Sequence, residues 1–184
     1  MFQYFMKLSS FILFSLLIFL VPMETILFDF SEKADVSDWQ IVNDNVMGGR
    51  SNSKLLINDA GNGVFTGTIS LENNGGFAST RYNTGTYPVL PNQTIKIRLK
   101  GDGQRYQFRV KNDKRAYWSY IQYFDTSGDW ETVTIALGAM YPTYRGRRLE
   151  APNFAENQIE ELGFLIGNKK EATFALEIDY VAID

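Results

Sequence analysis

The chain has 184 residues, 45% of them hydrophobic, which suits a single domain with a sizeable core plus a short appendage. The net charge of −3 offers no basic field for nucleic acid, so we expect no nucleic-acid partner. Cysteine and histidine are absent from the sequence, which excludes disulfides, thiolate nucleophiles, Ser-His-Asp triads and nearly all zinc and haem sites.

Residues 1–23 differ from the rest, because Lys7 precedes an uncharged apolar run over residues 11–23. This pattern is typical of a secretory signal or a short membrane anchor, although no small-x-small cleavage site follows it. A third interpretation is that translation starts at Met23. The first two place the protein in the cell envelope or on a membrane, and the third in the cytoplasm. In each case we expect one folded domain over residues 24–184.

The rest of the chain alternates apolar and polar residues between turn signals. Strands are predicted over residues 26–30, 54–57, 64–71, 78–82, 94–100, 105–111, 117–124, 130–137, 164–166 and 172–183. A helical turn is expected around Ile159 before residues 164–166. The pattern favours an all-β, two-sheet sandwich of jelly-roll type, with a closed barrel as the second interpretation.

Residues 94–100 and 105–111 predict a hairpin that turns through Gly101-Asp102-Gly103, with an apolar face and a basic face. One interpretation of the basic face is a solvated surface that protects a sheet edge. The other is a concave sheet lined by arginine and lysine, in which Arg109 grips a carboxylate or another polar ligand group.

Three loops interrupt the pattern. The first, residues 39–51, carries the run NDN followed by a Gly-Gly pair, and the second, residues 72–81, again places asparagines before a Gly-Gly pair. The third, residues 138–152, shows no periodicity and contains the basic run RGRR. Asparagine, aspartate and glycine favour turns, so one interpretation is ordinary turn chemistry. The other is that the loops form a single binding surface.

Carboxylates are the acid–base groups that remain for catalysis, but their spacing singles out no pair. No phosphate-binding loop or calcium-binding run is present in the sequence, so we expect no catalytic residue, no metal and no cofactor. Aromatic residues such as Trp39, Tyr120 and Trp130 are either core residues or platforms for stacking on sugars.

The segments WQIVNDNVMGGRS, FTGTISLENNGGFASTR, LKGDGQRYQFRV, YRGRRL and IEELGFLIGNKKEATFALEIDYV occur in this order. Together they resemble the bacterial branch of the complex I intermediate-associated protein family over residues 28–183. The resemblance implies a galactose-binding-like jelly-roll sandwich with a non-catalytic role. Mitochondrial members of that family act as chaperone-like assembly factors for NADH:ubiquinone oxidoreductase.

The resemblance therefore implies a protein partner, with an assembly intermediate of a respiratory or other membrane complex as the candidate. A carbohydrate-binding module of the cell envelope is the alternative. The apolar leader departs from the Arg- and Ser-rich transit peptide of mitochondrial members, and would place the domain away from a cytoplasm-facing assembly step. The shared motif positions, together with Arg109, give the candidate binding surface: Asn43, Asp44, Met47, Gly48, Gly49, Ser51, Asn73, Gly75, Gly76, Phe77, Arg81, Arg109, Arg145, Gly146 and Arg147.

Overall fold

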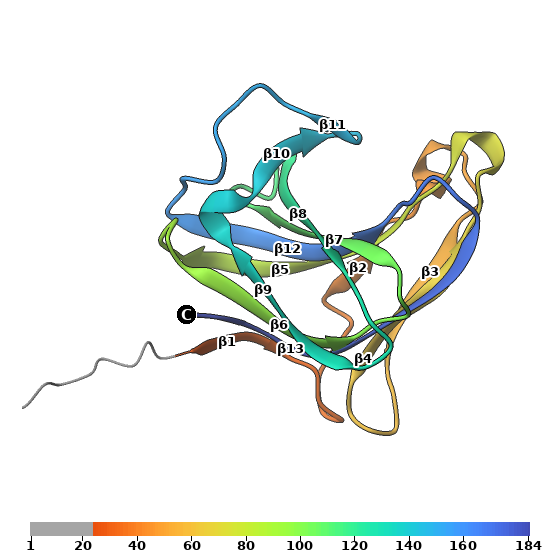
Figure 1. The fold of residues 1–184 in the computed structure, drawn as a ribbon, viewed down its shortest axis with the longest axis horizontal. Coiled ribbons are helices and arrows are strands. Elements are labelled where there is room, and N and C mark those ends of the chain that lie inside the picture. The colour runs from red at the N-terminus through yellow and green to blue at the C-terminus, as the bar shows by residue number, and fades with distance from the viewer. Residues whose placement is uncertain (1–23) are drawn as a thin grey trace, which may run out of the picture.

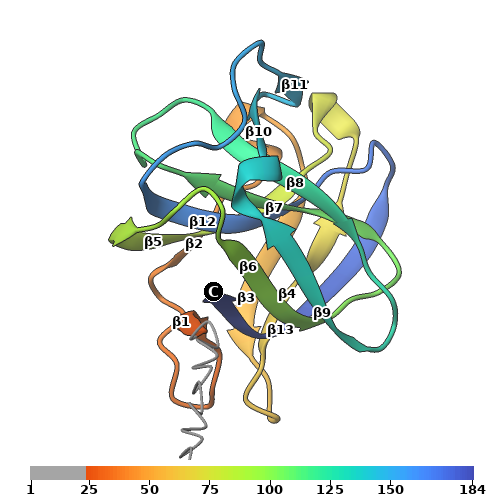
Figure 2. The same cartoon turned by 60° about the vertical axis from the view of Figure 1, so that its left-hand side comes forward.

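The computed structural model describes residues 24–184, so the leader predicted over residues 1–23 lies outside the described part of the chain. Two antiparallel sheets pack face to face, as Figures 1 and 2 show. This arrangement confirms the prediction of an all-β two-sheet sandwich. Within residues 24–184, no helix has the length and apolar character needed to cross a membrane.

The first sheet has six strands in the order β3-β4-β13-β6-β9, with β1 also paired to β13. Its strands are β1 (Thr25–Asp29), β3 (Asn52–Ile57), β4 (Gly63–Ile69), β6 (Thr94–Lys100), β9 (Trp130–Ala136) and β13 (Ala172–Ile183). The C-terminal strand β13 is the longest of these and lies between β4 and β6.

The second sheet has seven strands in the order β11-β10-β8-β7-β12-β5-β2. Its strands are β2 (Trp39–Ile41), β5 (Ala78–Pro88), β7 (Arg105–Lys111), β8 (Ser119–Asp125), β10 (Tyr141–Tyr144), β11 (Arg147–Arg148) and β12 (Gln158–Ile166). Three short 3₁₀ helices complete the described elements: η1 (Asp44–Met47), η2 (Glu72–Asn74) and η3 (Leu137–Ala139).

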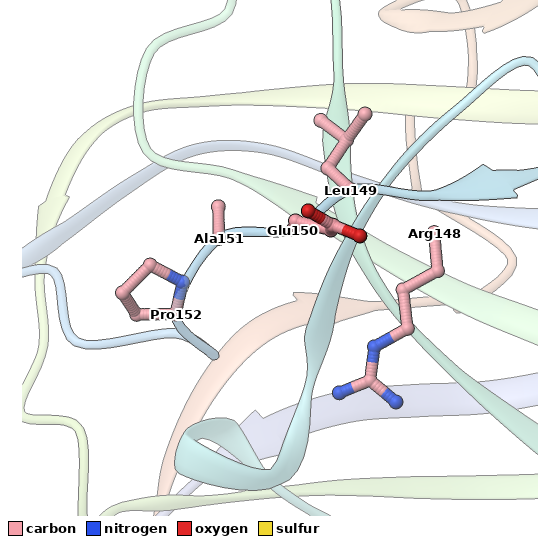
Figure 3. Close-up of a pocket in the computed structure, with 5 residues that line it drawn as sticks. All are labelled: Arg148, Leu149, Glu150, Ala151 and Pro152. Carbon is pink, nitrogen blue, oxygen red and sulfur yellow. The ribbon is translucent and has the colours of Figure 1, made fainter.

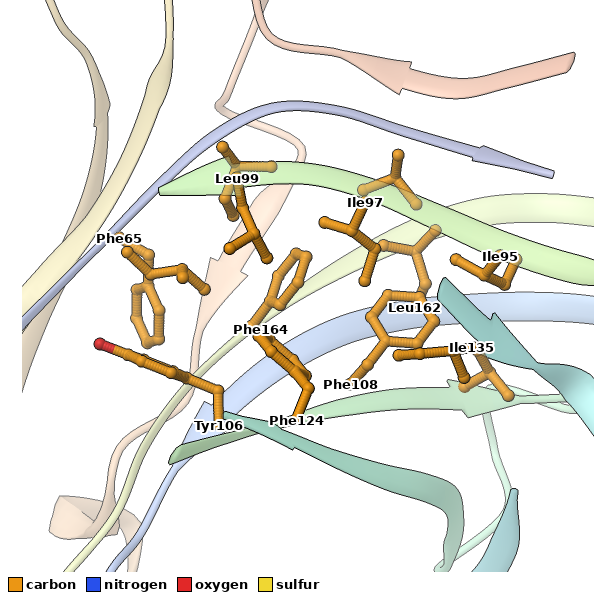
Figure 4. Packing of buried hydrophobic residues seen from close by; sticks show 14 of the residues in the cluster. Phe65, Ile95, Ile97, Leu99, Tyr106, Phe108, Phe124, Ile135, Leu162 and Phe164 are labelled. Atoms are coloured by element: carbon orange, nitrogen blue, oxygen red, sulfur yellow. The ribbon is translucent and has the colours of Figure 1, made fainter. Parts of the chain in front are cut away.

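The core fills the space between the two sheets. Figure 4 shows Phe65, Ile97 and Leu99 of the six-stranded sheet facing Phe108 and Phe164 of the seven-stranded sheet, and all five are fully buried. Each such side chain stabilises the fold by about 1.5–3 kcal/mol through burial. Because every second residue points inward, the remaining residues of each strand form two outer faces.

The predicted hairpin between residues 94–100 and 105–111 is wrong. β6 pairs with β13 and β9, whereas β7 pairs with β12 and β8 in the other sheet. The chain crosses between the sheets at Asp102, whose carboxylate accepts hydrogen bonds from the Tyr106 hydroxyl at 3.0 Å and the Ala175 amide at 2.9 Å. Both strands alternate because both face one core from opposite sides, and alternation alone does not distinguish this crossing from a hairpin.

The single basic face expected from that hairpin is therefore divided between the two outer faces of the sandwich. Lys96, Arg98 and Lys100 lie on the outer face of the six-stranded sheet. Arg105, Arg109 and Lys111 alternate with the core residues Tyr106, Phe108 and Val110 of β7 and lie on the outer face of the seven-stranded sheet.

Two further expectations are corrected by the structure. The segment around Ile159 that was expected to form a helical turn is part of strand β12. Its register with β5 shifts between Ile159 and Glu161, where Glu160 lies opposite three residues of β5, Thr84 to Thr86. Ile159 and Leu162 are both buried although they are three residues apart, with two consecutive glutamates between them, and this spacing resembles a helical turn in the sequence. Residues 138–152 are also not wholly irregular, because they contain the hairpin of β10 with β11.

Candidate functional site

The first two predicted loops lie at one end of the seven-stranded sheet. The first Gly-Gly loop, residues 43–51, follows β2, and the second, residues 71–77, precedes β5; β2 and β5 are paired. Trp39 fixes the start of β2, since its buried ring stacks on the rings of Tyr82 and Phe164. The ring centroids are 5.3 Å and 6.2 Å apart, respectively. Strand pairing therefore brings two segments that are distant in sequence to the same rim.

The carboxylate of Asp44 joins the two Gly-Gly loops. Its Oδ1 accepts a hydrogen bond from the Ser51 amide at 2.9 Å. Its Oδ2 accepts hydrogen bonds from the Ser51 hydroxyl, from the Gly76 amide at 2.6 Å and from the Phe77 amide at 3.2 Å. Asp44 is only 1% exposed, so these donors replace its hydration.

Burial raises the pKa of Asp44, but the hydrogen bonds from Ser51, Gly76 and Phe77 together outweigh that effect. The pKa of the Asp44 carboxyl is therefore held below its ordinary value. A carboxylate that is ionised and occupied by four donors has no free proton to give and little capacity to accept one. Its arrangement is that of a structural anion and not of a general acid or base.

The glycines of both pairs have a physical role at this carboxylate. A Cβ atom at Gly49 would overlap the Asp44 carboxylate, and one at Gly75 would lie 2.7 Å from its Oδ2. Gly48 and Gly76 have φ values of 91° and 133°, which side-chain-bearing residues rarely adopt. One glycine of each pair therefore allows close approach to Asp44, and the other allows the turn.

Further contacts hold the rim together. Asn73 donates from Nδ2 to the Gly48 carbonyl at 3.0 Å, and Arg50 forms an ion pair with Glu72 at 2.8 Å across the two loops. Asn43, which is buried, accepts a hydrogen bond from the Ser53 hydroxyl at 2.7 Å. Most polar groups predicted here as ligand-binding are thus engaged with their own chain.

The depressed pKa of Asp44 predicts a pH dependence of stability. The unfolded-state pKa of an aspartate is about 3.9, so Asp44 contributes its full stabilisation above that pH. This contribution to stability is lost as the pH falls from the unfolded-state pKa through the lower folded-state pKa. Protonation there removes the negative charge to which the four hydrogen-bond donors point. We expect the stability difference between the wild type and Asp44→Asn in urea unfolding to shrink between pH 6 and pH 3. A difference that stays constant with pH would contradict this assignment.

The third predicted loop lies apart from the other two. Arg145, Gly146 and Arg147 belong to the β10–β11 hairpin, which is at the opposite edge of the seven-stranded sheet from β2. Within residues 24–184, no hydrogen bond or ion pair joins these three residues to either Gly-Gly loop. Figures 1 and 2 show the β10–β11 hairpin standing apart from the Gly-Gly loops, each of which connects the two sheets by running from β2 into β3 or from β4 into β5.

Between these two rims lies the outer face of the seven-stranded sheet, which carries Arg81 and Arg109. Arg81 on β5 and Arg109 on β7 are both paired with Gly163 of the intervening strand β12. Gln107 accepts a hydrogen bond from Arg109 Nη1 at 2.9 Å and donates one to the Tyr123 hydroxyl at 2.9 Å. Burial, and then the charge of Arg81, lower the pKa of Arg109 to about 10. Arg109 therefore remains a cation near neutral pH.

Lys111 lies on the same face but is already satisfied. Its ammonium donates to the Ala116 carbonyl at 2.8 Å and lies 3.8 Å from the Glu161 carboxylate. Burial lowers its pKa, and the neighbouring Glu161 opposes that shift. The carboxylate nearest the arginine pair is thus engaged by Lys111.

Two surface hollows lie apart from Asp44, Arg81 and Arg109. One of about 640 Å³ is lined by five consecutive residues, Arg148 to Pro152, and Figure 3 shows Arg148 and Leu149 extending in opposite directions. A second, of about 420 Å³, lies by Phe30, Gly61 and Asp179. Residues 24–184 contain no group of three or more carboxylates placed to hold a metal ion.

Gln107 and Tyr123 contribute to the outer face but were not singled out from the sequence. The spacing of Gln107 two residues before Arg109 was the available signal, since residues i and i+2 of a strand share a face. Tyr123 could not be placed there without the register of β7 with β8, which pairs it with Gln107.

Solved structures with this architecture confirm the predicted galactose-binding-like jelly roll. The family 11 carbohydrate-binding module of the Clostridium thermocellum cellulase Lic26A-Cel5E superposes with a TM-score of 0.64 at 15% identity, covering 87% of this chain and 94% of that one. The same family's module from Clostridium thermocellum, in complex with a β-1,3-1,4-mixed-linked tetrasaccharide, gives a TM-score of 0.63 at 16% identity, with the same coverage. These identities establish a common fold alone.

Sequence comparison establishes the family. The mitochondrial Complex I intermediate-associated protein 30 of Mus musculus is 23% identical over an alignment of 181 residues. The alignment covers 86% of this chain and 55% of the mouse protein. The chain therefore spans about half the length of that relative. The family model for Complex I intermediate-associated protein 30 matches residues 28–178, which include both Gly-Gly loops and the whole arginine-bearing face. The chain belongs to the Complex I intermediate-associated protein 30 family.

Proposed function

We propose that this protein is a non-catalytic binding module that supports assembly of a respiratory NADH:ubiquinone oxidoreductase or another membrane complex by contacting a protein partner. The observation that carries the proposal is the family match over residues 28–178. The chemistry of the rim supports it, because the buried carboxylate in the family motif is consumed by structural hydrogen bonds. A site without a free acid, base or nucleophile suits binding better than turnover.

The rim also presents apolar surface to a partner. Met47 is 59% exposed and Leu71 is 41% exposed, and they lie on the two loops that Asp44 joins. Hydrogen bonds hold Gly48 and Gly76 of the same two loops, so the loops lose little conformational entropy when a partner covers them. Methionine and leucine on a rigid support are suited to a protein interface.

The proposal predicts that a charge placed on this rim strongly reduces recovery of the partner. We expect the tagged full-length protein, crosslinked in cells that produce it naturally, to recover subunits of NADH:ubiquinone oxidoreductase or of another membrane complex. Met47→Asp and Leu71→Asp should reduce that recovery by about tenfold, because each buries a charge at the interface. Leu90→Asp is the control, since Leu90 is 60% exposed, at least as much as Met47 and Leu71, but lies between β5 and β6. Recovery of no membrane-complex subunit by the wild type would refute the proposal.

Carbohydrate binding is the second candidate function. It is favoured by the placement of Tyr123 and Tyr141 on the outer face of the seven-stranded sheet beside the amide of Gln107. Aromatic rings next to hydrogen-bonding groups are suited to sugars. Calorimetry with a β-1,3-1,4-mixed-linked tetrasaccharide at millimolar concentration tests it. Measurable heat that is lost in Tyr141→Ala would support this function, and no heat with this or other glucans would exclude it for that class.

A further inference from the structure

The outer face of the seven-stranded sheet carries two arginines that lack a carboxylate partner. Within residues 24–184, the Arg81 side chain has no hydrogen-bond or ion-pair partner, and Arg109 has one acceptor, Gln107 Oε1 at 2.9 Å. Each guanidinium offers five N–H donors. Most of the donor capacity of the pair is therefore unused by the protein itself.

The register brings these two guanidinium groups to one place. Arg81 and Arg109 pair with opposite sides of Gly163, so their backbones are two strand spacings apart, roughly 10 Å. Gly163 has no side chain, and a Cβ there would overlap the Thr80 carbonyl, so no group of β12 stands between the arginines. Their proximity is unfavourable in the free protein, since the charge of Arg81 opposes the charged form of Arg109.

Neighbouring side chains orient Arg109 and leave its remaining donors free for an external carboxylate. The Tyr123 hydroxyl accepts from the Gln107 amide, which directs the Gln107 carbonyl oxygen to Arg109 Nη1. Glu161, the acidic neighbour on this face, is paired with Lys111 at 3.8 Å. An external carboxylate between the arginines would supply the missing acceptors and relieve the repulsion at once.

The same face disfavours a neutral sugar. The guanidinium carbon of Arg105 lies 4.4 Å from the Tyr123 ring centroid, and that of Arg148 lies 4.5 Å from the Tyr141 centroid. Each aromatic ring that a sugar would use already has a cation over one of its faces. The cationic side chains of this face are Arg81, Arg105, Arg109, Lys111 and Arg148, against the carboxylates Asp125, Glu160 and Glu161.

We propose that the outer face of the seven-stranded sheet is the docking site for an acidic segment of the partner protein, with an Asp or Glu carboxylate bound between Arg81 and Arg109. This inference rests on the proposed function and specifies the chemistry of the partner. The carboxylate accepts from both guanidiniums. Lys111 and Arg105 are paired with Glu161 and Asp125, so Arg148 is the remaining cation of the face that attracts a further acidic residue of the segment. The Gly-Gly rim then supplies apolar contacts at the end of the sheet.

A direct test measures binding of a fluorescein-labelled hexaglutamate peptide to the full-length protein by fluorescence anisotropy at physiological salt. We expect Arg81→Gln and Arg109→Gln each to raise the dissociation constant by about tenfold. Arg98→Gln is the matched control, because Arg98 lies on the outer face of the six-stranded sheet and stacks on Trp130 at 5.6 Å. It should change the constant by less than about twofold. Thermal unfolding of each variant checks that it is folded, and Arg81→Gln alone suffices if Arg109→Gln unfolds.

The other outcomes overturn the proposal. Equal weakening by Arg98→Gln would mean unspecific charge attraction, and binding of trigalacturonate without binding of hexaglutamate would make the occupant an acidic glycan. Absence of hexaglutamate binding would also refute it. If Arg81→Gln still recovers membrane-complex subunits after crosslinking as the wild type does, this docking site is wrong while the proposed function stands.

Discussion

Replacing Asp44 by asparagine is expected to lower the free energy of unfolding by about 3 kcal/mol, because a buried carboxylate that accepts four hydrogen bonds becomes an amide. Asparagine keeps one acceptor oxygen and gains an NH₂ group. If the oxygen takes the place of Oδ2, the NH₂ group meets the Ser51 amide, which is also a donor. If it takes the place of Oδ1, the NH₂ group meets the Gly76 and Phe77 amides.

Chemical denaturation of the purified variant measures this loss. Asp59→Asn is the matched control, since Asp59 is exposed in the turn between β3 and β4, and its change should stay within about 0.5 kcal/mol. Ser51→Ala should fall between the two, because it removes one of the four donors. A loss below about 1 kcal/mol for Asp44→Asn would show that the carboxylate does not hold the two loops together.

Alanine at Gly49 or Gly75 is expected to destabilise the protein by about 2–3 kcal/mol, because the added methyl group overlaps the Asp44 carboxylate. Gly75 has φ −68°, which alanine adopts readily, so the cost at that position comes from crowding and not from the backbone. The Asp44 carboxylate cannot move away from the added methyl group, since its oxygens accept hydrogen bonds from backbone amides on both loops.

Gly128→Ala provides the control for this prediction. Gly128 has open space around the position of a Cβ and no unusual φ, so alanine there should change the stability by no more than about 0.5 kcal/mol. The melting temperatures of the three variants give the comparison. Equal effects at Gly49, Gly75 and Gly128 would contradict close packing at Asp44. Partner recovery should fall with stability in Gly49→Ala, because Met47 loses its fixed support.

The architecture could be predicted because inward and outward residues alternate in almost every strand, and alternation depends only on local sequence. The pairing of the strands could not be predicted in this way, because it depends on contacts between distant segments. β6 and β7 are neighbours in sequence with the right turn residues, yet Gly101 packs against Thr126 and the chain crosses to the other sheet. The shape of β12 at Ile159 could not be predicted, because the additional residues of the register shift belong to β5 and β12 itself shows only the three-residue spacing from Ile159 to Leu162.

For the candidate site, the sequence indicates which residues take part but not which of them contact one another. The family resemblance names Asp44, Ser51 and the four glycines as shared motif positions, and the structure brings them together. That Asp44 is occupied by the second loop depends on a contact across more than thirty positions, which no local pattern reports. Arg81 and Arg109 were both named, but their common neighbour Gly163 appears only in the three-strand register. The hairpin with Arg145 to Arg147 belongs to the opposite edge of the sheet.

The placement of β13 between β4 and β6 has a consequence for how the protein is made. On a ribosome, the β3–β4 and β6–β9 pairs emerge first, but nothing joins them until residues 172–183 have been synthesised. β12 has the same position between β5 and β7 in the other sheet. The strands of both sheets therefore have unpaired edges until β12 and β13 have been synthesised, and folding is delayed until late in translation. A ribosome that stalls before β12 would release a chain in which neither sheet can close, and such chains are expected to be cleared or to aggregate.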